Sequence, residues 1–336
     1  MTELLALTPE ELQALLPDQP AYRAGQVFRW LHKGITAFDQ MSDLPAALRQ
    51  RLGETGLLTV PEAARVQTAR DGTVKILWRL SDGQRVESVL MRHHHGESLC
   101  LSTQAGCRQG CLFCASTVGG LVRNLTAAEM LAQVQSMPRE TGRTPDHLVL
   151  MGIGEPLDNF NEVVRFLTLV SHPQGLGLSL RRVSLSTCGL IDGIRRLAAL
   201  DLPLTLSVSL HAPDDETRSR LMPVNRSGDV ERLLAVCRDY FRATGRRVSY
   251  EYLLLDEIND TPDKARALGR LLRGAPAHVN LILYNQTGRD PGLRPSKPEA
   301  VRAFRDIVSA YGPVVTLRRS LGGEIDAACG QLRGGN

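Results

Sequence analysis

The chain has 336 residues, of which 43% are hydrophobic and 23% are charged, a composition typical of a globular protein with a large core. The net charge of +4, from 40 Lys and Arg against 36 Asp and Glu, permits a polyanionic partner without requiring one. No basic segment follows Met1 and no apolar run reaches the length of a membrane span, so we expect neither a secretory segment nor membrane insertion, and a cytoplasmic location.

Residues 1–60 have the pattern of a small helical domain. Residues 8–11, Thr-Pro-Glu-Glu, offer an N-cap, a proline at the first helical position and an acidic residue in the first turn. Apolar residues follow at helical spacing as far as Leu44, Leu48 and Leu52. The domain carries more acidic than basic residues, so a polyanion would have to bind it through a local face.

Residues 61–97 contain the pattern of a β-hairpin. Segments 73–80 and 84–90 mix apolar and polar residues and flank the turn sequence Ser81-Asp82-Gly83. The triplet His93-His94-His95 follows and raises the hypothesis of a metal site. Adjacent residues of a strand point to opposite faces, so three consecutive histidines cannot all face one ion. We favour a solvated loop for this triplet.

From residue 98 onward, predicted strands alternate with predicted helices. One helix is expected to begin after Thr126, because Glu129 three residues later completes a capping box. Repeated β-then-α units indicate a parallel sheet or an open barrel, in which reactive groups gather beyond the carboxyl ends of the strands. The expected strands are residues 99–103, 147–151, 182–186, 204–210, 248–255, 279–284 and 314–317.

Small, polar or reactive residues stand where these strands end. They are Cys107, the run Gly152-Ile153-Gly154-Glu155-Pro156, the run Ser186-Thr187-Cys188-Gly189, the run Ser209-Leu210-His211 and the run Tyr284-Asn285-Gln286. Any one of these runs alone would be read as an ordinary turn. Together, and in register with the strands, they predict a ligand site at this edge of the sheet.

Three cysteines carry the most specific signal: Cys107, Cys111 and Cys114, in the run Gly-Cys-Arg-Gln-Gly-Cys-Leu-Phe-Cys-Ala. Cubane iron-sulfur clusters normally take a thiolate on each of four irons, so three thiolates leave one iron open to another ligand. Structural zinc is the alternative, but zinc sites usually pair cysteines in two knuckles, and no second pair stands nearby. A disulfide framework is disfavoured because seven cysteines are few and odd in number.

The spacing Cys-x3-Cys-x2-Cys resembles the cluster loop of the radical S-adenosylmethionine superfamily. Nearly the whole chain resembles the RlmN and Cfr family of radical S-adenosylmethionine RNA methyltransferases. The most distinctive match is the run Ile-Asp-Ala-Ala-Cys-Gly-Gln-Leu at residues 325–332, and further matches lie at residues 99–102, 123–126, 151–156 and 209–213. The resemblance implies an α/β fold, an open (β/α)6 partial TIM barrel at residues 98–336, with a helical RNA-binding accessory domain (1–60) and a β-hairpin extension (61–97).

The resemblance also implies the cofactors. Cys107, Cys111 and Cys114 would hold one 4Fe-4S cluster, whose open iron chelates S-adenosylmethionine. An electron delivered by a reductase would release a 5'-deoxyadenosyl radical, and each turnover would use two molecules of S-adenosylmethionine. The implied contacts to S-adenosylmethionine are Gly154, Glu155, Ser186, Ser209, Leu210, His211 and Asn285.

Three further residues receive catalytic roles by resemblance. Cys329 would accept a methyl group, from which the radical abstracts a hydrogen so that the carbon can add to an adenine ring. Cys100 would release the product by attacking the Cys329 sulfur, leaving a disulfide, and Glu87 would remove the ring proton. A ring carbon between two nitrogens is too electron-poor to attack a sulfonium methyl group, which is why a radical route is needed.

The substrates implied by the family are an adenosine in the peptidyl-transferase region of 23S rRNA and the adenosine beside the tRNA anticodon. We favour methylation at C2 by a monomeric enzyme. The alternatives are C8 methylation of the Cfr type, a radical enzyme acting on a small molecule, and a non-catalytic RNA-binding protein stabilised by a metal. We interpret Cys188 and Cys237 as packing residues, and residues 284–295 depart from the family pattern.

Overall fold

One large sheet organises the molecule. The computed structural model describes residues 1–287, 289 and 292–334, and in this part of the chain ten strands form the sheet in the order β14-β13-β12-β11-β10-β9-β6-β5-β4-β3. Within this sheet, the neighbouring strands from β14 up to and including β6 run parallel to one another. They are β6 (Gly96–Cys100), β9 (His147–Leu150), β10 (Val183–Thr187), β11 (Thr205–Ser209), β12 (Val248–Leu254), β13 (Ala277–Leu283) and β14 (Val314–Leu317). These parallel strands agree with the predicted open barrel.

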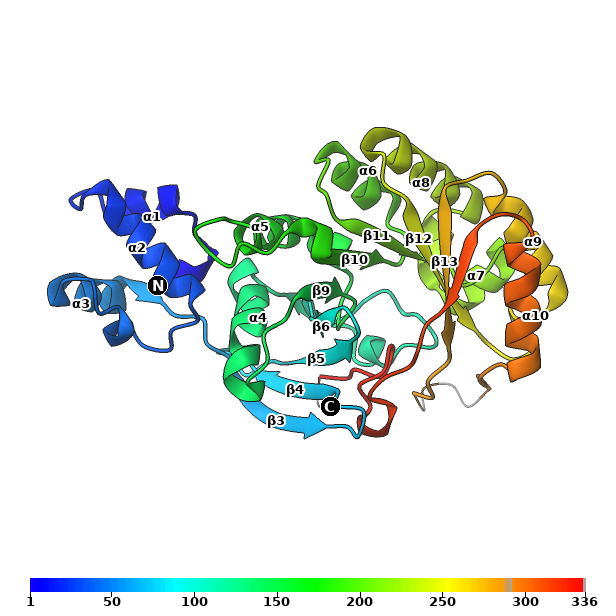
Figure 1. Ribbon diagram of the computed structural model, residues 1–336, viewed down its shortest axis with the longest axis horizontal. Helices are drawn as coiled ribbons and strands as arrows, with labels where there is room; N and C mark the ends of the chain where they lie inside the picture. The colour runs from blue at the N-terminus through cyan, green and yellow to red at the C-terminus, as the bar shows by residue number, and fades with distance from the viewer. Residues whose placement is uncertain (288, 290–291, 335–336) are drawn as a thin grey trace.

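Helices cover the outer face of the parallel strands, as Figure 1 shows. They are α4 (Ala127–Thr141), α5 (Phe160–Val170), α6 (Ile191–Ala199), α7 (Asp215–Leu221), α8 (Val230–Thr244), α9 (Pro262–Leu272) and α10 (Pro298–Ser309). The predicted capping box opens α4, because the Thr126 side chain accepts from the Glu129 backbone and Glu129 accepts from the Thr126 backbone. The α/β fold class is therefore confirmed.

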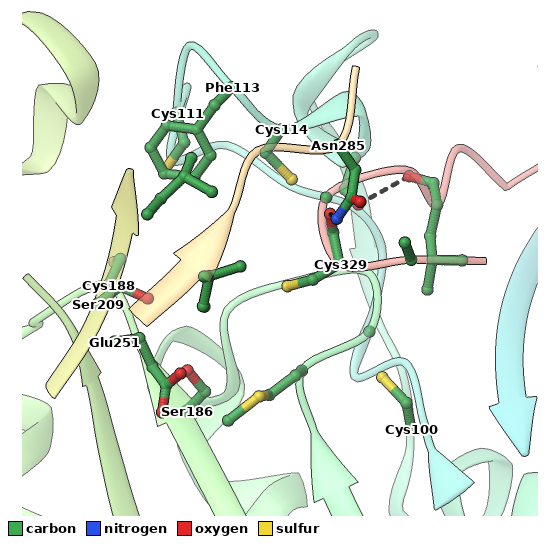
Figure 2. A pocket seen from close by; sticks show the side chains of 18 of the residues that line it. Cys100, Cys111, Phe113, Cys114, Ser186, Cys188, Ser209, Glu251, Asn285 and Cys329 are labelled. Carbon is green, nitrogen blue, oxygen red and sulfur yellow. Dashed lines mark hydrogen bonds between the residues drawn. The ribbon is translucent and has the colours of Figure 1, made fainter. Parts of the chain in front are cut away.

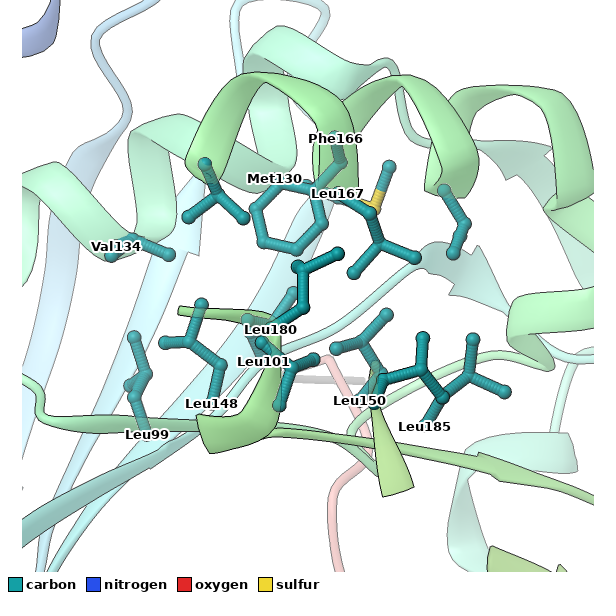
Figure 3. Close-up of a cluster of buried hydrophobic side chains, with 14 of the residues drawn as sticks. Leu99, Leu101, Met130, Val134, Leu148, Leu150, Phe166, Leu167, Leu180 and Leu185 are labelled. Atoms are coloured by element: carbon teal, nitrogen blue, oxygen red, sulfur yellow. The ribbon is translucent and has the colours of Figure 1, made fainter. Parts of the chain in front are cut away.

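The main core lies between the sheet and these helices. Figure 3 shows Leu99, Leu148 and Leu185 from the strands facing Met130 and Phe166 from α4 and α5. All five side chains are 0% exposed. Each contributes about 1.5–3 kcal/mol to folding through burial, which makes this layer a rigid support for the strand ends.

The antiparallel part of the sheet is larger than the predicted hairpin. The two expected arms are β4 (Val74–Arg79) and β5 (Arg85–His93), but β3 (Glu62–Thr68) pairs with β4, and β5 pairs with β6. The hairpin thus continues the barrel sheet. We missed β3 because it is an edge strand without a fully buried face, so its residues show no apolar alternation.

The N-terminal segment folds into the predicted helices. They are α1 (Pro9–Leu15), α2 (Ala21–His32) and α3 (Ala46–Thr55). The short strand β1 (Thr2–Glu3), which precedes these helices in the chain, pairs with β2 (Gly56–Leu57), which follows them. In Figure 1 this part (blue) lies at one end of the long axis, and Arg165 of α5 donates to the Ala6 carbonyl at 2.8 Å. Among the described helices, none combines the length and the apolar character needed to cross a bilayer.

Short elements complete the described chain. Two strands, β7 (Gln104–Gly106) and β8 (Leu121–Asn124), form a small antiparallel pair around the cysteine loop. The single-turn helices are η1 (Leu4–Ala6), η2 (Phe38–Gln40), η3 (Ala115–Thr117), η4 (Pro156–Asn159), η5 (Leu180–Arg182), η6 (Pro223–Ser227) and η7 (Gly323–Ile325).

Candidate active site

A cavity of about 180 Å³ opens at the carboxyl ends of the parallel strands, where the sequence predicts a ligand site. Most of the predicted site residues line it: Cys100, Cys107, Cys111, Cys114, Gly154, Glu155, Ser186, Ser209, His211, Asn285 and Cys329. Figure 2 shows the thiols of Cys114 and Cys329 pointing into the same space. Two predicted residues, Glu87 and Leu210, are not among the lining residues.

The three predicted cluster cysteines lie on the loop between β7 and η3, which neighbouring segments hold in place. Cys107 N donates to Gly120 O at 2.9 Å, and Ala115 N donates to Gly330 O at 2.8 Å. Gly106 has φ +76°, and a Cβ there would come within 2.0 Å of the Gly120 oxygen, so only glycine fits at the start of the loop.

The donor set of this loop fits a multi-iron cluster. Cys107 and Cys111 are buried, and all three thiols are free. Burial raises the pKa of Cys107 to about 12 and also raises the pKa of Cys111, so these thiols stay neutral unless a bound metal removes their protons. In the described residues no group of three or more His, Cys, Asp or Glu side chains is gathered for a single metal ion.

Glu155 is held at the bottom of the cavity. Its Oε1 accepts from Leu157 N at 3.0 Å, capping η4, and its Oε2 accepts from Cys188 N at 2.7 Å. Burial raises the pKa of Glu155, and these hydrogen bonds oppose the rise. The preceding Gly154 has φ +111°, and a Cβ there would meet Gln104 Cβ at 2.6 Å, so a larger residue would push the Glu155 loop away.

The end of β11 shows which side chains reach the cavity. Ser209 and His211 line it, whereas Leu210 is 0% exposed and packs in the main core. His211 has φ +56°, and its Nδ1 accepts from Leu253 N at 2.9 Å. Burial, followed by the nearby Arg218, lowers the pKa of His211 to about 3, so the imidazole is neutral at physiological pH. Leu210 can contribute only backbone atoms at this position.

Cys100 and Cys329 reach the cavity from opposite ends of the sequence. Cys100 ends β6, and burial raises its pKa to about 12. Cys329 projects into the cavity, where the surrounding protein raises its pKa and Arg318 lowers it. Both are free thiols in this structure, which therefore gives no support to the expected disulfide between them. The Asn285 Nδ2 donates to the Cys329 carbonyl at 3.4 Å, so this hydrogen bond joins the segment after β13 to the C-terminal segment that carries Cys329.

Glu87 is engaged elsewhere. It is 5% exposed, its Oε1 lies 3.1 Å from Lys75 Nζ, and its Oε2 accepts from the backbone N–H groups of Arg333 at 2.6 Å and Gly334 at 3.0 Å. The carboxylate thus fastens the C-terminal segment to the antiparallel strands. Its predicted role as a base stays a prediction.

Several lining residues escaped the sequence analysis, and Glu251 and Arg318 are two charged ones. Glu251 of β12 accepts from Asn280 Nδ2 at 2.7 Å, and burial raises its pKa while Arg318 lowers it. Arg318, just after β14, also lines the cavity and approaches Met151 Sδ at 3.6 Å. A carboxylate inside the apolar run of β12 was the available signal for Glu251, since an acidic residue is rarely buried without a partner.

The remaining expectations have mixed outcomes. Cys237 packs in the main core as predicted. Cys188 packs beside Cys111, Leu221 and Met222, but it also lines the cavity. His94 and His95 are exposed at the turn after β5, whereas His93 is half-buried and lines the cavity. The stretch 284–295 lies partly outside the described residues.

Comparison with known proteins identifies the family. The model of the radical SAM superfamily matches residues 101–268, and the model of the ribosomal RNA large subunit methyltransferase N-terminal domain matches residues 2–57. A protein of Symbiobacterium thermophilum is 50% identical over 98% of this chain and 91% of its own length. A protein of Pelotomaculum thermopropionicum is 49% identical over 97% and 90%, respectively. Both relatives are named probable dual-specificity RNA methyltransferase RlmN.

A solved structure agrees with this result. The crystal structure of a radical SAM methyltransferase from Sphaerobacter thermophilus is 42% identical, covers 99% of this chain and 100% of its own, and superposes with a TM-score of 0.95. Sequence, fold and site geometry therefore lead to one conclusion: the chain belongs to the RlmN family within the radical SAM superfamily.

Proposed function

We propose that this protein is a radical S-adenosylmethionine methyltransferase that forms 2-methyladenosine in 23S rRNA and in tRNA. One observation carries the proposal: one cavity is lined by the three cysteines of the loop, by Cys100 and Cys329, and by every residue expected to bind S-adenosylmethionine except Leu210. When bound at this site, a 4Fe-4S cluster and S-adenosylmethionine would supply an electron and a carbon-centred radical. The RlmN names of the relatives support RNA as the substrate.

The residues of this chain have separate tasks in the proposal. Cys329 carries the methyl group on its sulfur and presents it to an adenine carbon inside the cavity. Cys100 lies on the same cavity and attacks the Cys329 sulfur, which breaks the bond from that sulfur to the carbon on the base. A Cys100–Cys329 disulfide forms, and the electron pair of the broken bond stays on the carbon, which takes up a proton to become the methyl group of the product. Glu87 accepts the proton from the ring carbon, which requires it to leave Lys75 and the backbone of Arg333 and Gly334.

The partners follow from the substrate. A base inside a duplex cannot reach this cavity, so the target adenosine must be unstacked, as in loops. We propose that residues 1–60 act as an accessory RNA-binding domain, that a reductase supplies the electron, and that the enzyme works as a monomer in the cytoplasm, where its RNA substrates are.

Mass spectrometry of nucleosides tests the proposal directly. Ribosomal and transfer RNA treated with the reconstituted enzyme should contain 2-methyladenosine. If 8-methyladenosine appears instead, the enzyme acts at C8. Purified protein with stoichiometric zinc, no iron and no sulfide would support the non-catalytic alternative and contradict the proposed function.

Methylation of Cys329 should rise with pH. The protein around Cys329 raises its pKa above the usual value for a thiol, so only a small fraction is thiolate near neutral pH. Transfer of labelled methyl from S-adenosylmethionine to Cys329 should therefore increase about tenfold per unit between pH 6 and pH 8. Because Arg318 lowers this pKa, Arg318→Gln should move the profile to higher pH. A flat profile would show that thiolate formation does not limit the step.

Glu87→Gln should stop RNA methylation after Cys329 has been methylated. A missing base typically costs 10² to 10⁴ in rate, so we expect a loss of at least about 100-fold in methylated RNA with normal labelling of Cys329. Lys75→Met is the matched control, because it removes the buried partner of Glu87 without removing the carboxylate. If the two variants lose thermal stability alike and retain RNA methylation alike, Glu87 has a structural role only.

A further inference from the structure

Arg218 is a buried cation beside the candidate active site. It lies on α7, and its side chain is 1% exposed. Burying a guanidinium is costly unless protein groups replace its water, and this cost is seldom accepted where an apolar residue would serve. Neither the sequence motifs nor the proposed chemistry gives this arginine a task, so its contacts are informative.

The guanidinium joins the ends of two neighbouring strands. Nη2 donates to the carbonyls of Cys188 at 2.7 Å and Ser209 at 3.1 Å, and Nε donates to the carbonyl of Leu210 at 3.1 Å. Cys188 directly follows β10, and Ser209 ends β11. The planar guanidinium group of Arg218 therefore fixes the spacing between the two strand ends that present Ser186 and Ser209 to the cavity.

The same contacts reach Glu155. The peptide of Cys188 accepts from Arg218 through its carbonyl, while its N–H donates to Glu155 Oε2 at 2.7 Å. Movement of the Arg218 side chain would therefore shift the group that orients the Glu155 carboxylate. In the described part of the chain the hydrogen bonds of Arg218 go to Cys188, Ser209, Leu210 and Asn225 and not to Glu155, so Arg218 acts on Glu155 through Cys188.

The positive charge of Arg218 has no directly bonded counter-ion. Its fourth acceptor is Asn225 Oδ1 at 2.7 Å, so none of its acceptors in the described residues is a carboxylate. Asn225 in turn donates to Asp215 Oδ1 at 3.0 Å. On the other side, Cys188 and Cys111 belong to one buried apolar cluster, and both lie close enough to Arg218 for an electrostatic interaction. The guanidinium charge therefore lies close to the cysteine loop, and the Asp215 carboxylate also interacts with it electrostatically.

We propose that Arg218 is a positioning residue with two effects: its hydrogen bonds set the geometry of the S-adenosylmethionine site, and its charge favours the reduced state of the cluster. This inference rests on the proposed function. Three thiolates give an oxidised 4Fe-4S cluster a net negative charge, and reduction by one electron adds another. A nearby cation in a medium of low dielectric constant stabilises that added charge, which makes the reduction potential less negative.

Three variants separate the two effects. Arg218→Lys keeps the positive charge but loses the planar set of guanidinium N–H donors. Arg218→Gln loses the charge but keeps an amide N–H donor. Arg220→Gln is the matched control, because Arg220 is exposed on the same helix. The measurements are the cluster midpoint potential, by titration with dithionite followed by electron paramagnetic resonance, and the Kd of S-adenosylmethionine by equilibrium dialysis. Circular dichroism and iron content establish that each variant is folded and loaded.

The expected results differ between variants. Arg218→Gln should shift the midpoint potential to more negative values and weaken S-adenosylmethionine binding about tenfold, since it loses several hydrogen bonds from a charged donor. Arg218→Lys should keep the midpoint potential near that of the unmodified protein while binding is weakened by a similar factor. Arg220→Gln should change neither quantity.

Two results would overturn the inference. The first is a folded, loaded Arg218→Gln protein that matches Arg220→Gln in both measurements. The second is an Arg218→Lys protein with unchanged S-adenosylmethionine binding or a shifted midpoint potential, and this result decides if Arg218→Gln does not fold. The function proposed above fails separately, when the unmodified protein itself binds no iron or no S-adenosylmethionine.

Discussion

Cys100→Ala is expected to accumulate protein covalently bound to RNA, whereas Cys329→Ala is expected to form no such adduct. Both residues line the same cavity, but they have different places in the proposed sequence of bonds. Without Cys329 there is no methyl carrier, so no bond to the base can form. Without Cys100 the carrier still adds to the base, and no thiol at this position can release it. The adduct should appear as a slowly migrating band on a denaturing gel that collapses on treatment with ribonuclease.

A third cysteine of the cavity gives the control for this experiment. Cys188→Ala removes a thiol from the same cavity, yet the proposal gives that thiol no part in bond formation or release. It should give neither the adduct of Cys100→Ala nor the inactivity of Cys329→Ala. A folded, cluster-loaded Cys100→Ala protein without adduct, or an adduct in Cys329→Ala, would contradict the assigned roles.

The strand ends could be predicted because the signals were local. The succession of strand and helix candidates located the parallel strands, and the residue that follows each strand must lie at the carboxyl edge of the sheet. The two-residue period of an extended chain separates Ser209 and His211 from Leu210, since alternate residues share a face. Applied strictly, it would have placed Leu210 in the core, where the structure has it. The family resemblance named the run and did not distinguish its side chains.

The missing parts of the site depended on contacts between distant segments. The carboxylate of Glu87 accepts from Arg333 and Gly334, more than two hundred residues away in the chain, and no pattern near Glu87 announces that partner. Arg218 occupies an ordinary position in a short helix rich in charged residues, and only the folded chain shows that it is buried against three carbonyls. Long-range hydrogen bonds of this kind are set by packing, which a single sequence does not display.

Serine at Cys107, Cys111 or Cys114 is expected to abolish iron binding, whereas serine at Cys188 or Cys237 is expected to leave it intact. The first three thiols share one loop and one cavity, and a cluster with only two thiolate ligands has lost a second iron site. Cys237 is 1% exposed in the core, away from the cavity, so its serine variant controls for the general cost of altering a buried cysteine. Iron and acid-labile sulfide per chain, measured after anaerobic purification, give the comparison.

Cys188 sharpens this experiment, because it is a further thiol of the same cavity that could replace a lost ligand. It lies in the same cavity and packs against Cys111, yet its backbone N–H is already committed to Glu155. Burial raises the pKa of Cys188 well above that of an ordinary thiol, as it does for Cys107 and Cys111, and the nearby Glu155 carboxylate raises it further. If Cys188→Ser loses its iron while Cys237→Ser keeps it, Cys188 is a ligand and the assignment of three cluster cysteines is wrong. If Cys111→Ser keeps its iron, Cys188 has taken the place of Cys111, and the double variant should then lose it.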